Sequence, residues 1–456
     1  MVQQKENKMG VMPIGKLIFT MSLPMIISML VQAVYNIVDS IFVAHFSSVA
    51  LSAVNYSFPA QNLMIGVATG TGVGVNALLS RSLGEKNPER ANKVAANGVL
   101  LALFGYLLFL VFGLFGARWF IAFQTSDAAI IEAGYEYLST CCIFSFGIFG
   151  EIMFERLMQA TGRTVYTLFT QGVGAVCNII LDPIFIFGYF GVPAMGARGA
   201  AIATVIGQIV AFIMAVILNH FKNHDVKLSA KSFKADLKII GGIYAIGVPS
   251  MIMMGIGSFT TTTVNKILNG FGEVAVNVFG VYFKLQSFAF MPIFGLNNGV
   301  IPIIGYNYGA RNRARVMRTI RLSVTTIIII MLGALTVFWA FPTALLGLFN
   351  ADAEMLKIGI PALRTISLSY VFAGVCIGFT SVFQALGKGI YATIMSFARQ
   401  LVVLVPAAYL LSLTGNVDMV WWSYPIAEVG SVIVCAILFI RLYNKVIKPL
   451  DNSKNN

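Results

Sequence analysis

Four residues with oxygen-bearing side chains lie inside long apolar stretches of the sequence: Asp39, Asn178, Asp182 and Thr204. An acid within a membrane span is energetically costly, so each acid there is a functional hypothesis by default. Asn178 precedes Asp182 by four residues, which stacks the two side chains on one helix face. Two carboxylates, an amide and a hydroxyl can form an all-oxygen cage for Na⁺. Alternatively, two desolvated carboxylates can hold a proton, because loss of water favours the neutral form.

The expected helices place three of these residues at one depth. Asp39 lies about five residues from the outer end of the first span, Asp182 about seven from that of the fifth, and Thr204 about six from that of the sixth. The alternative is that each Asp caps a helix or hydrogen-bonds a neighbouring helix. Caps belong at helix termini, and these residues lie well inside the spans, which favours an ion site.

Other ionisable residues within the spans have less specific surroundings. Glu151 lies in mid-span, where it could face a central cavity and attract cationic cargo, whereas an ion pair on one helix face explains Glu155 and Arg156. For Lys284 a structural role is favoured, with its amine paired to an acid or extended outward. Glu428 suits a hydrogen bond between helices as well as it suits a cargo contact.

The chain has 36 Phe and 20 Met, and both residue types suit a cavity that accepts varied apolar cations. Most of them are expected to face lipid or to pack between helices. Met153, Phe288 and Met291 are predicted to line the cavity together with Glu151.

Two prolines occupy equivalent places early in two spans, Pro24 and Pro249. A proline ring removes one backbone hydrogen bond and permits a kink in a helix. A bend at Pro24 would move Asp39 relative to Asp182. Both prolines are therefore predicted hinges that could couple ion binding to cargo release.

The elements that position these residues follow from composition. Of the 456 residues 58% are hydrophobic and 11% charged, and the mean hydropathy is +0.83. A soluble core could not hide so much apolar surface, so the fold class is an all-α polytopic membrane protein. Twelve transmembrane helices are expected near residues 14–44, 50–79, 94–122, 131–159, 164–189, 198–221, 238–268, 275–306, 319–348, 355–385, 390–413 and 419–444.

Basic residues indicate the orientation of these spans. Assigning alternate loops to opposite sides gathers most of the 31 Lys and Arg on one side, including Lys5, the lysines of 222–238, the arginines of 311–321 and Lys454. Both termini are therefore expected in the cytoplasm, with the protein in the plasma membrane. The net charge of +13 is explained by this topology, so no nucleic-acid partner is expected.

A repeat with a constant offset of 225 residues divides the chain. It pairs Pro24 with Pro249, Gly84 with Gly309, and QATGRTVY at 159–166 with QALGKGIY at 384–391. Each half of six spans returns to its starting side, so the two halves are parallel repeats. The predicted organisation is an N-terminal lobe at 1–218, a cytoplasmic linker at 219–238 and a C-terminal lobe at 239–456. Two lobes around a central cavity suit alternating access.

The sequence resembles the MATE family of multidrug and toxic-compound exporters over nearly its whole length. The motifs that carry the resemblance are SLPMIISMLVQAVYNIVDSIFVA in the first span, SRSLGEKNPERA in the first cytoplasmic loop, QATGRT after the fourth span, CNIILDPIFIFG in the fifth and GARGAAIAT in the sixth. The resemblance implies two pseudo-symmetric six-helix lobes opening in a V shape, and an exchange of inward H⁺ or Na⁺ for outward drug.

The same resemblance implies that Asp39, Asn178, Asp182 and Thr204 line the cation site of the N-terminal lobe, as in the DinF-like and MepA-like branch. The NorM-like branch uses acids of the C-terminal lobe instead. The corresponding stretches here, IMMGIGSFTTTTVNKIL and YVFAGVCIGFTSVFQALG, contain no acid. An ion site in the C-terminal lobe is therefore not expected.

The expected function is a multidrug efflux antiporter that exports lipophilic organic cations in exchange for H⁺ or Na⁺. We expect a monomer in the lipid bilayer, with no cofactor and no resident metal beyond the coupling ion. The alternative is a flippase for a lipid-linked saccharide, although relatives with that task tend to have more basic cavities and extra spans. An enzyme is not expected, because the sequence lacks HExxH, a P-loop and a Ser/His or His/Asp constellation within its spans.

Overall fold

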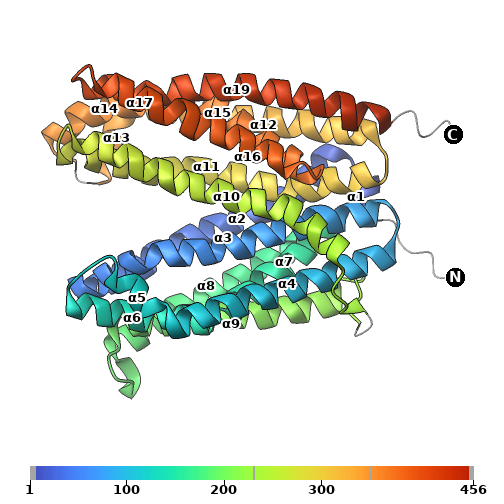
Figure 1. Cartoon of the computed structure of the whole chain (residues 1–456), viewed down its shortest axis with the longest axis horizontal. Coiled ribbons are helices and arrows are strands. Elements are labelled where there is room, and N and C mark those ends of the chain that lie inside the picture. The colour runs from blue at the N-terminus through green and yellow to red at the C-terminus, as the bar shows by residue number, and fades with distance from the viewer. Residues whose placement is uncertain (1–6, 230–231, 350, 451–456) are drawn as a thin grey trace.

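The computed structural model describes residues 7–229, 232–349 and 351–450, and every regular element within them is a helix. Lys5, Lys231 and Lys454, which contribute to the expected charge bias, lie outside the described residues. Figure 1 shows the blue to green helices of the N-terminal lobe beside the yellow to red helices of the C-terminal lobe. This arrangement confirms the expected all-α architecture of two lobes.

The N-terminal lobe is built from the first half of the chain. Its elements are α1 (Lys8–Val11), α2 (Ile14–Phe46), α3 (Ser48–Gly84), α4 (Pro88–Phe115), α5 (Ala117–Ala122), α6 (Ala128–Ile143), α7 (Phe146–Ala160), α8 (Thr164–Phe187), the short 3₁₀ helix η1 (Tyr189–Gly191) and α9 (Gly196–Lys222).

The C-terminal lobe repeats the same order of long helices. Its elements are α10 (Leu237–Asn269), α11 (Glu273–Gly309), α12 (Arg313–Ala340), α13 (Pro342–Gly347), α14 (Ala353–Ser367), α15 (Tyr370–Ala385), α16 (Gly389–Phe397), the π-helix η3 (Ala398–Leu404), α17 (Val405–Ser412), α18 (Val417–Trp421), α19 (Ser423–Leu442), the π-helix η4 (Tyr443–Ile447) and η5 (Lys448–Leu450).

The number of membrane spans agrees with the prediction of twelve. In the described residues, ten helical segments are long and apolar enough to cross a membrane, and two bent helix pairs bring the number to twelve when each pair counts as one span. These pairs are α6 with α7, at 44°, and α14 with α15, at 49°. The predicted spans 131–159 and 355–385 are therefore broken rather than continuous.

Hydroxyl groups bond back to the helix backbone at both breaks. Thr140 Oγ donates to the carbonyl oxygen of Glu136 at 2.6 Å, just before the first break. Ser369 Oγ donates to the carbonyl oxygen of Ile366, also at 2.6 Å, at the second break. Hydroxyl groups that bond back to the helix backbone bend helices, and hydropathy alone does not reveal this effect.

The lobes meet through glycines at one end of the bundle. A Cβ atom on Gly84 would lie 1.9 Å from the carbonyl oxygen of Tyr306, and one on Gly309 would lie 2.2 Å from that of Arg81. Gly309 lies 225 residues after Gly84, and Tyr306 lies 225 after Arg81, so the two contacts are reciprocal. The absent side chains let α3 and α11 pack backbone to backbone.

Further interlobe contacts follow the same symmetry. Gly70 packs against Met251 of α10, and its repeat partner Gly295 packs against Ile26 of α2. These contacts close the space between the lobes over the half of the bundle that contains the 85–87 and 310–312 turns. In Figure 1, α1, the end of α19 and the connection from α9 to α10 lie at this same end.

Candidate functional site

Three helices bring the predicted ion-site residues together. Asn178 and Asp182 lie on α8, Thr204 on α9 and Asp39 on α2, and both α2 and α9 pack against α8. Asn178 Nδ2 donates to Asp182 Oδ1 at 3.2 Å and to Thr204 Oγ1 at 3.3 Å. The carboxyl groups of Asp39 and Asp182 lie close enough to interact with each other. The common depth predicted from helical rise therefore corresponds to proximity in the structure.

Small residues allow α8 and α9 to approach closely at this point. A Cβ atom on Gly207 would lie 2.8 Å from the carbonyl oxygen of Gly174 and 3.3 Å from Cβ of Asn178. Close approach of two helices through glycines is typical of membrane bundles. It brings the side chain of Asn178 within reach of Thr204.

The cluster has more acceptors than donors. An ionised carboxylate only accepts hydrogen bonds, so a contact between Asp39 and Asp182 requires a proton or a cation between them. Asp39 Oδ1, Asn178 Oδ1 and Asp182 Oδ2 are buried and receive no hydrogen bond from any described residue. Asp182 itself is fully buried. Buried oxygens without a donor are costly, so this cluster favours binding of a proton or a hard cation.

Tyr35 belongs to the surroundings of this cluster, although sequence reasoning missed it. It precedes Asp39 by four residues, which places both side chains on one face of α2. It lies close enough to Asp39, Asp182 and Glu151 to interact electrostatically with all three. The spacing of four residues from Asp39 is the signal that could have revealed it.

A second group that the sequence analysis missed lies between α3 and α6. Gln61 Nε2 donates to Tyr137 Oη at 3.2 Å and contacts Cys141 Sγ at 3.4 Å. Tyr137 is close enough to Asp39 for an electrostatic interaction. Gln61, a polar residue within an apolar span, is the feature of the sequence that could have indicated this group.

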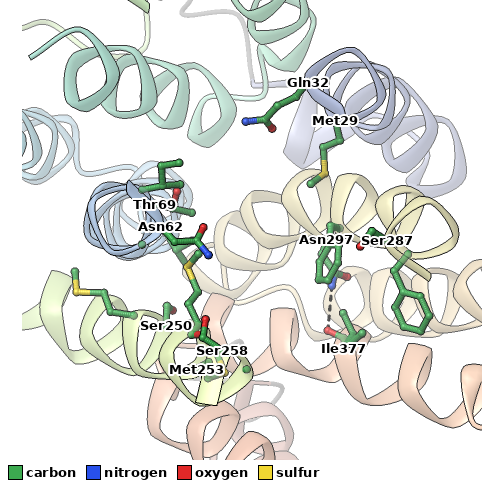
Figure 2. A pocket seen from close by; sticks show the side chains of 18 of the residues that line it. Met29, Gln32, Asn62, Thr69, Ser250, Met253, Ser258, Ser287, Asn297 and Ile377 are labelled. Atoms are coloured by element: carbon green, nitrogen blue, oxygen red, sulfur yellow. Dashed lines mark hydrogen bonds between the residues drawn. The ribbon is translucent and has the colours of Figure 1, made fainter. Parts of the chain in front are cut away.

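A cavity of about 1400 Å³ lies between the lobes. Figure 2 shows side chains from α2 and α3, including Gln32 and Asn62, around the same space as side chains from α10 and α11, including Ser258 and Asn297. Six methionines and five phenylalanines contribute to its walls: Met25, Met29, Met251, Met253, Met254, Met395, Phe58, Phe279, Phe283, Phe290 and Phe294. Asn178 and Thr204 also line it, so the ion-site cluster borders the cavity.

Five charged side chains reach the cavity wall: Glu151, Glu155, Arg156, Arg399 and Glu428. The position predicted for Glu151 is therefore the position found. The remaining wall is largely apolar, with hydroxyl and amide groups between the methionines and rings. Such a surface offers attraction to charged groups without many directional contacts.

The other three residues predicted to line the cavity lie elsewhere. Met153 is 2% exposed and packs against Gly98 in the core of the N-terminal lobe. Phe288 is 43% exposed but is not part of the cavity wall, and neither is Met291. In α11 the wall is formed by neighbours such as Phe290 and Phe294, because rotation about the helix axis turns Phe288 and Met291 away.

The predicted ion pair between Glu155 and Arg156 is wrong. Glu155 accepts hydrogen bonds from Thr170 Oγ1 at 2.6 Å and from Gln171 Nε2 at 2.9 Å. Arg156 Nη1 instead donates to Gln159 and, across the lobe interface, to Asn298 Oδ1 at 3.0 Å. Consecutive residues of a helix point in different directions, which separates the two charges.

The remaining predicted residues take distinct places. Lys284 is exposed outside the cavity wall and its amine lies 5.9 Å from the ring centroid of Phe349, which fits the favoured structural role. Pro24 and Pro249 are buried inside α2 and α10, which continue as helices through both prolines. Their hinge function stays a prediction.

In the described residues, no group of three or more His, Cys, Asp or Glu side chains is placed to hold a metal ion.

Comparison with known proteins identifies the family. The family model described as MatE matches residues 24–184 and 249–410, which is more than half of the chain. The chain belongs to the MatE family. The two matched segments begin at Pro24 and Pro249, the pair that opened the repeat in the sequence. Membership places this multi-pass membrane protein among transporters rather than enzymes.

Relatives of this MatE-family chain are similar over most of their length. "Multidrug export protein MepA" of Staphylococcus haemolyticus is 29% identical over 438 residues, covering 93% of this chain and 92% of the relative. The protein of the same name from Staphylococcus aureus is 28% identical over 427 residues, covering 91% of each.

Solved structures agree in fold. A crystal structure of a MATE in complex with MaL6 is 25% identical with a TM-score of 0.90, covering 98% of this chain and 99% of the other. A structure described as the outward-facing conformation of a multidrug resistance MATE family transporter has the same identity, TM-score and coverage.

Proposed function

We propose that this MatE-family chain is a multidrug efflux antiporter, which exports lipophilic organic cations in exchange for H⁺ or Na⁺. One observation carries the proposal. A cluster of two carboxyl groups, an amide and a hydroxyl, with three buried oxygens that lack a donor, borders a large and mostly apolar cavity between two lobes. The names of the staphylococcal relatives support export of drugs.

The cavity suits cargo that is apolar and positively charged. Rings and thioethers provide dispersion contacts and face cations favourably. Glu151 lies in the cavity wall close to Tyr35 and the ion site. A lipophilic cation attracted to Glu151 would therefore bind beside the coupling residues.

The coupling step follows from the balance of donors and acceptors. A proton or Na⁺ that enters from outside supplies the missing positive charge between Asp39 and Asp182. The neutralised site no longer favours a cation nearby, so the cargo leaves. Release of the ion toward the cytoplasm restores the negative charge that attracts the next cargo molecule. A bend of α2 at Pro24 would link these states, with Pro249 in the equivalent place of α10.

The proposal includes an organisation and a topology. The N-terminal lobe comprises 1–218, the linker 219–238 and the C-terminal lobe 239–456, although α9 continues to Lys222 and α10 begins at Leu237. Both termini and the linker are cytoplasmic, and the protein works as a monomer in the plasma membrane. The cluster of basic residues at the end where α1, α19 and the linker meet supports this orientation.

The flippase alternative has less support. A lipid-linked saccharide carries phosphate groups, which favour a strongly basic cavity. Here three glutamates and two arginines line the wall, so its acidic side chains outnumber its basic ones.

Inverted membrane vesicles test the proposal directly. Their lumen corresponds to the cell exterior, so an acid or Na⁺-rich lumen, imposed separately, should drive uptake of a lipophilic cationic dye. Uptake with one of the two gradients supports antiport and identifies the ion. Absence of uptake with either gradient, at full expression of the protein, contradicts it.

A further inference from the structure

An ion pair in the C-terminal lobe forms a second charged site on the cavity wall. Arg399 Nη1 lies 3.2 Å from Glu428 Oε1, and both residues line the cavity. Their side chains are 24% and 9% exposed, so the guanidinium is the more accessible partner. The sequence analysis left Glu428 open as a helix contact or a cargo contact and did not predict its pairing with Arg399.

The backbone around Arg399 departs from a regular α-helix. Residues Ala398–Leu404 form the π-helix η3, which connects α16 to α17 within one span. Arg399 and Gln400 both belong to this segment, and both line the cavity. Short π-helical turns are frequent at functional sites, where the wider turn re-aims side chains.

The pair is not part of the structural repeat. The positions 225 residues earlier hold Gly174 for Arg399 and Ala203 for Glu428. The N-terminal lobe therefore forms the same helix packing without either charge. A buried ion pair contributes little net stability, because desolvation offsets much of the attraction. These facts favour a role in binding over a role in folding.

The hydrogen bonds of the pair leave capacity for a ligand. A guanidinium has five N–H donors in a planar fork, and within the described part of the chain Arg399 donates a single hydrogen bond, to Glu428. Glu428 Oε2 is buried and has no donor among the described residues. Arg399 can therefore keep Glu428 as a partner and still offer N–H groups to a group in the cavity. Planar recognition of a carboxylate is the interaction that this fork fits best.

We propose that Arg399 binds the carboxylate of zwitterionic cargo, while the cationic end of the same molecule lies toward Glu151 in the N-terminal lobe. This inference rests on the proposed function and assigns Arg399 as a residue that determines which cargo the cavity binds. Without such cargo, Glu428 neutralises Arg399, so the cavity also accepts monocations. A volume of about 1400 Å³ exceeds that of common drug pockets, about 300–1000 Å³, and allows one molecule to contact both lobes.

Two dyes that differ only in the carboxylate test this proposal. Tetramethylrhodamine is a zwitterion with a free carboxylate, and its methyl ester is a lipophilic cation. We expect wild-type inverted vesicles to take up both dyes under the driving gradient. In a double variant, Arg399→Gln with Glu428→Gln, both charges are removed together, so neither group is left unpaired.

The decisive quantity is the uptake of the zwitterion divided by that of the ester. The double variant should lower this ratio about tenfold or more, which is the size of effect expected for a charge-assisted hydrogen bond. Arg399→Lys should lower it less, because the charge remains and the planar fork is lost. Lys284→Gln, which removes a cation of the same lobe outside the cavity wall, should leave the ratio at the wild-type value.

Each other outcome overturns one specific claim. An unchanged ratio in the double variant, or equal loss of both dyes, contradicts carboxylate binding by Arg399. Uptake of the ester alone by the wild type contradicts this inference and leaves the proposed function standing. Uptake of neither dye contradicts the proposed function itself.

Discussion

The carboxyl groups of Asp39 on α2 and Asp182 on α8 lie close enough to interact with each other. Two ionised carboxylates repel each other, so this proximity favours a shared proton or a bound cation. Asn178 is hydrogen-bonded to Asp182 at 3.2 Å and connects the pair to Thr204 at the cavity wall. Under the proposed function, protonation or ion binding at this pair changes the charge beside the cavity.

The reciprocal glycine contacts predict sensitivity to a single methyl group. Gly84→Ala would place Cβ 1.9 Å from the carbonyl oxygen of Tyr306, so the lobes could not pack as they do. We expect a destabilisation of this interlobe packing of about 1–3 kcal/mol, the usual range for overpacking. Gly309→Ala should have a similar effect, because its contact with Arg81 is the repeat equivalent. Thermal unfolding and dye transport measure both effects.

Gly172→Ala is the matched control for these substitutions, because no atom lies within 4 Å of the Cβ position. It should leave the melting temperature and transport close to wild type. Wild-type behaviour of both Gly84→Ala and Gly309→Ala would contradict close packing of the lobes at this end.

The proposed topology predicts labelling from opposite faces. Asn223 lies in the linker but is an unsuitable position for labelling. It is 3% exposed and donates a hydrogen bond to Asn219 Oδ1 at 2.9 Å, so a reagent would not reach it. Ser229 is exposed and Ala351 half-exposed, so single cysteines there should react. In intact cells, a membrane-impermeant maleimide should label position 351 and not position 229.

The native thiols require a suitable background for this experiment. Four of the five cysteines are buried, and the partly exposed Cys177 should be replaced by alanine. Inverted vesicles should reverse the pattern. Labelling of both positions from outside the cell would overturn the topology.

The spans and the grouping of the polar residues could be predicted from the sequence because both depend on distances along a helix. An apolar run of sufficient length indicates a span, and helical rise alone placed Asp39 and Asp182 at one depth. The same argument did not reach the break at Phe144 and Ser145, because an apolar run of this length is equally consistent with a continuous helix.

Rotation about a helix axis could not be predicted in the same way. Helices that are apolar on all sides give no sequence pattern that distinguishes cavity from lipid or core, so Met153, Phe288 and Met291 were wrong as wall residues. The π-helix that contains Arg399 has no sequence signature either. The pairing of Arg399 with Glu428 is seen only in the three-dimensional structure.

Replacement of Pro24 by alanine should slow transport without preventing folding. The proline has no N–H for the carbonyl oxygen of Thr20, so Pro24→Ala would restore that hydrogen bond and stiffen α2. We expect a slower rate of dye export at an unchanged level of protein in the membrane. Initial rates in vesicles measure the effect, and a rate equal to wild type would exclude bending at Pro24 from the transport cycle.

The most direct test of the account replaces each carboxyl group of the ion site by an amide. Asp39→Asn and Asp182→Asn keep the size and shape of the side chain, and neither amide can take up a proton or carry charge. With amounts in the membrane and melting temperatures matched to wild type, gradient-driven uptake of tetramethylrhodamine methyl ester into inverted vesicles should fall to the background of vesicles without the protein. Uptake at the wild-type rate by both variants, under either an H⁺ or a Na⁺ gradient, would contradict coupling at Asp39 and Asp182.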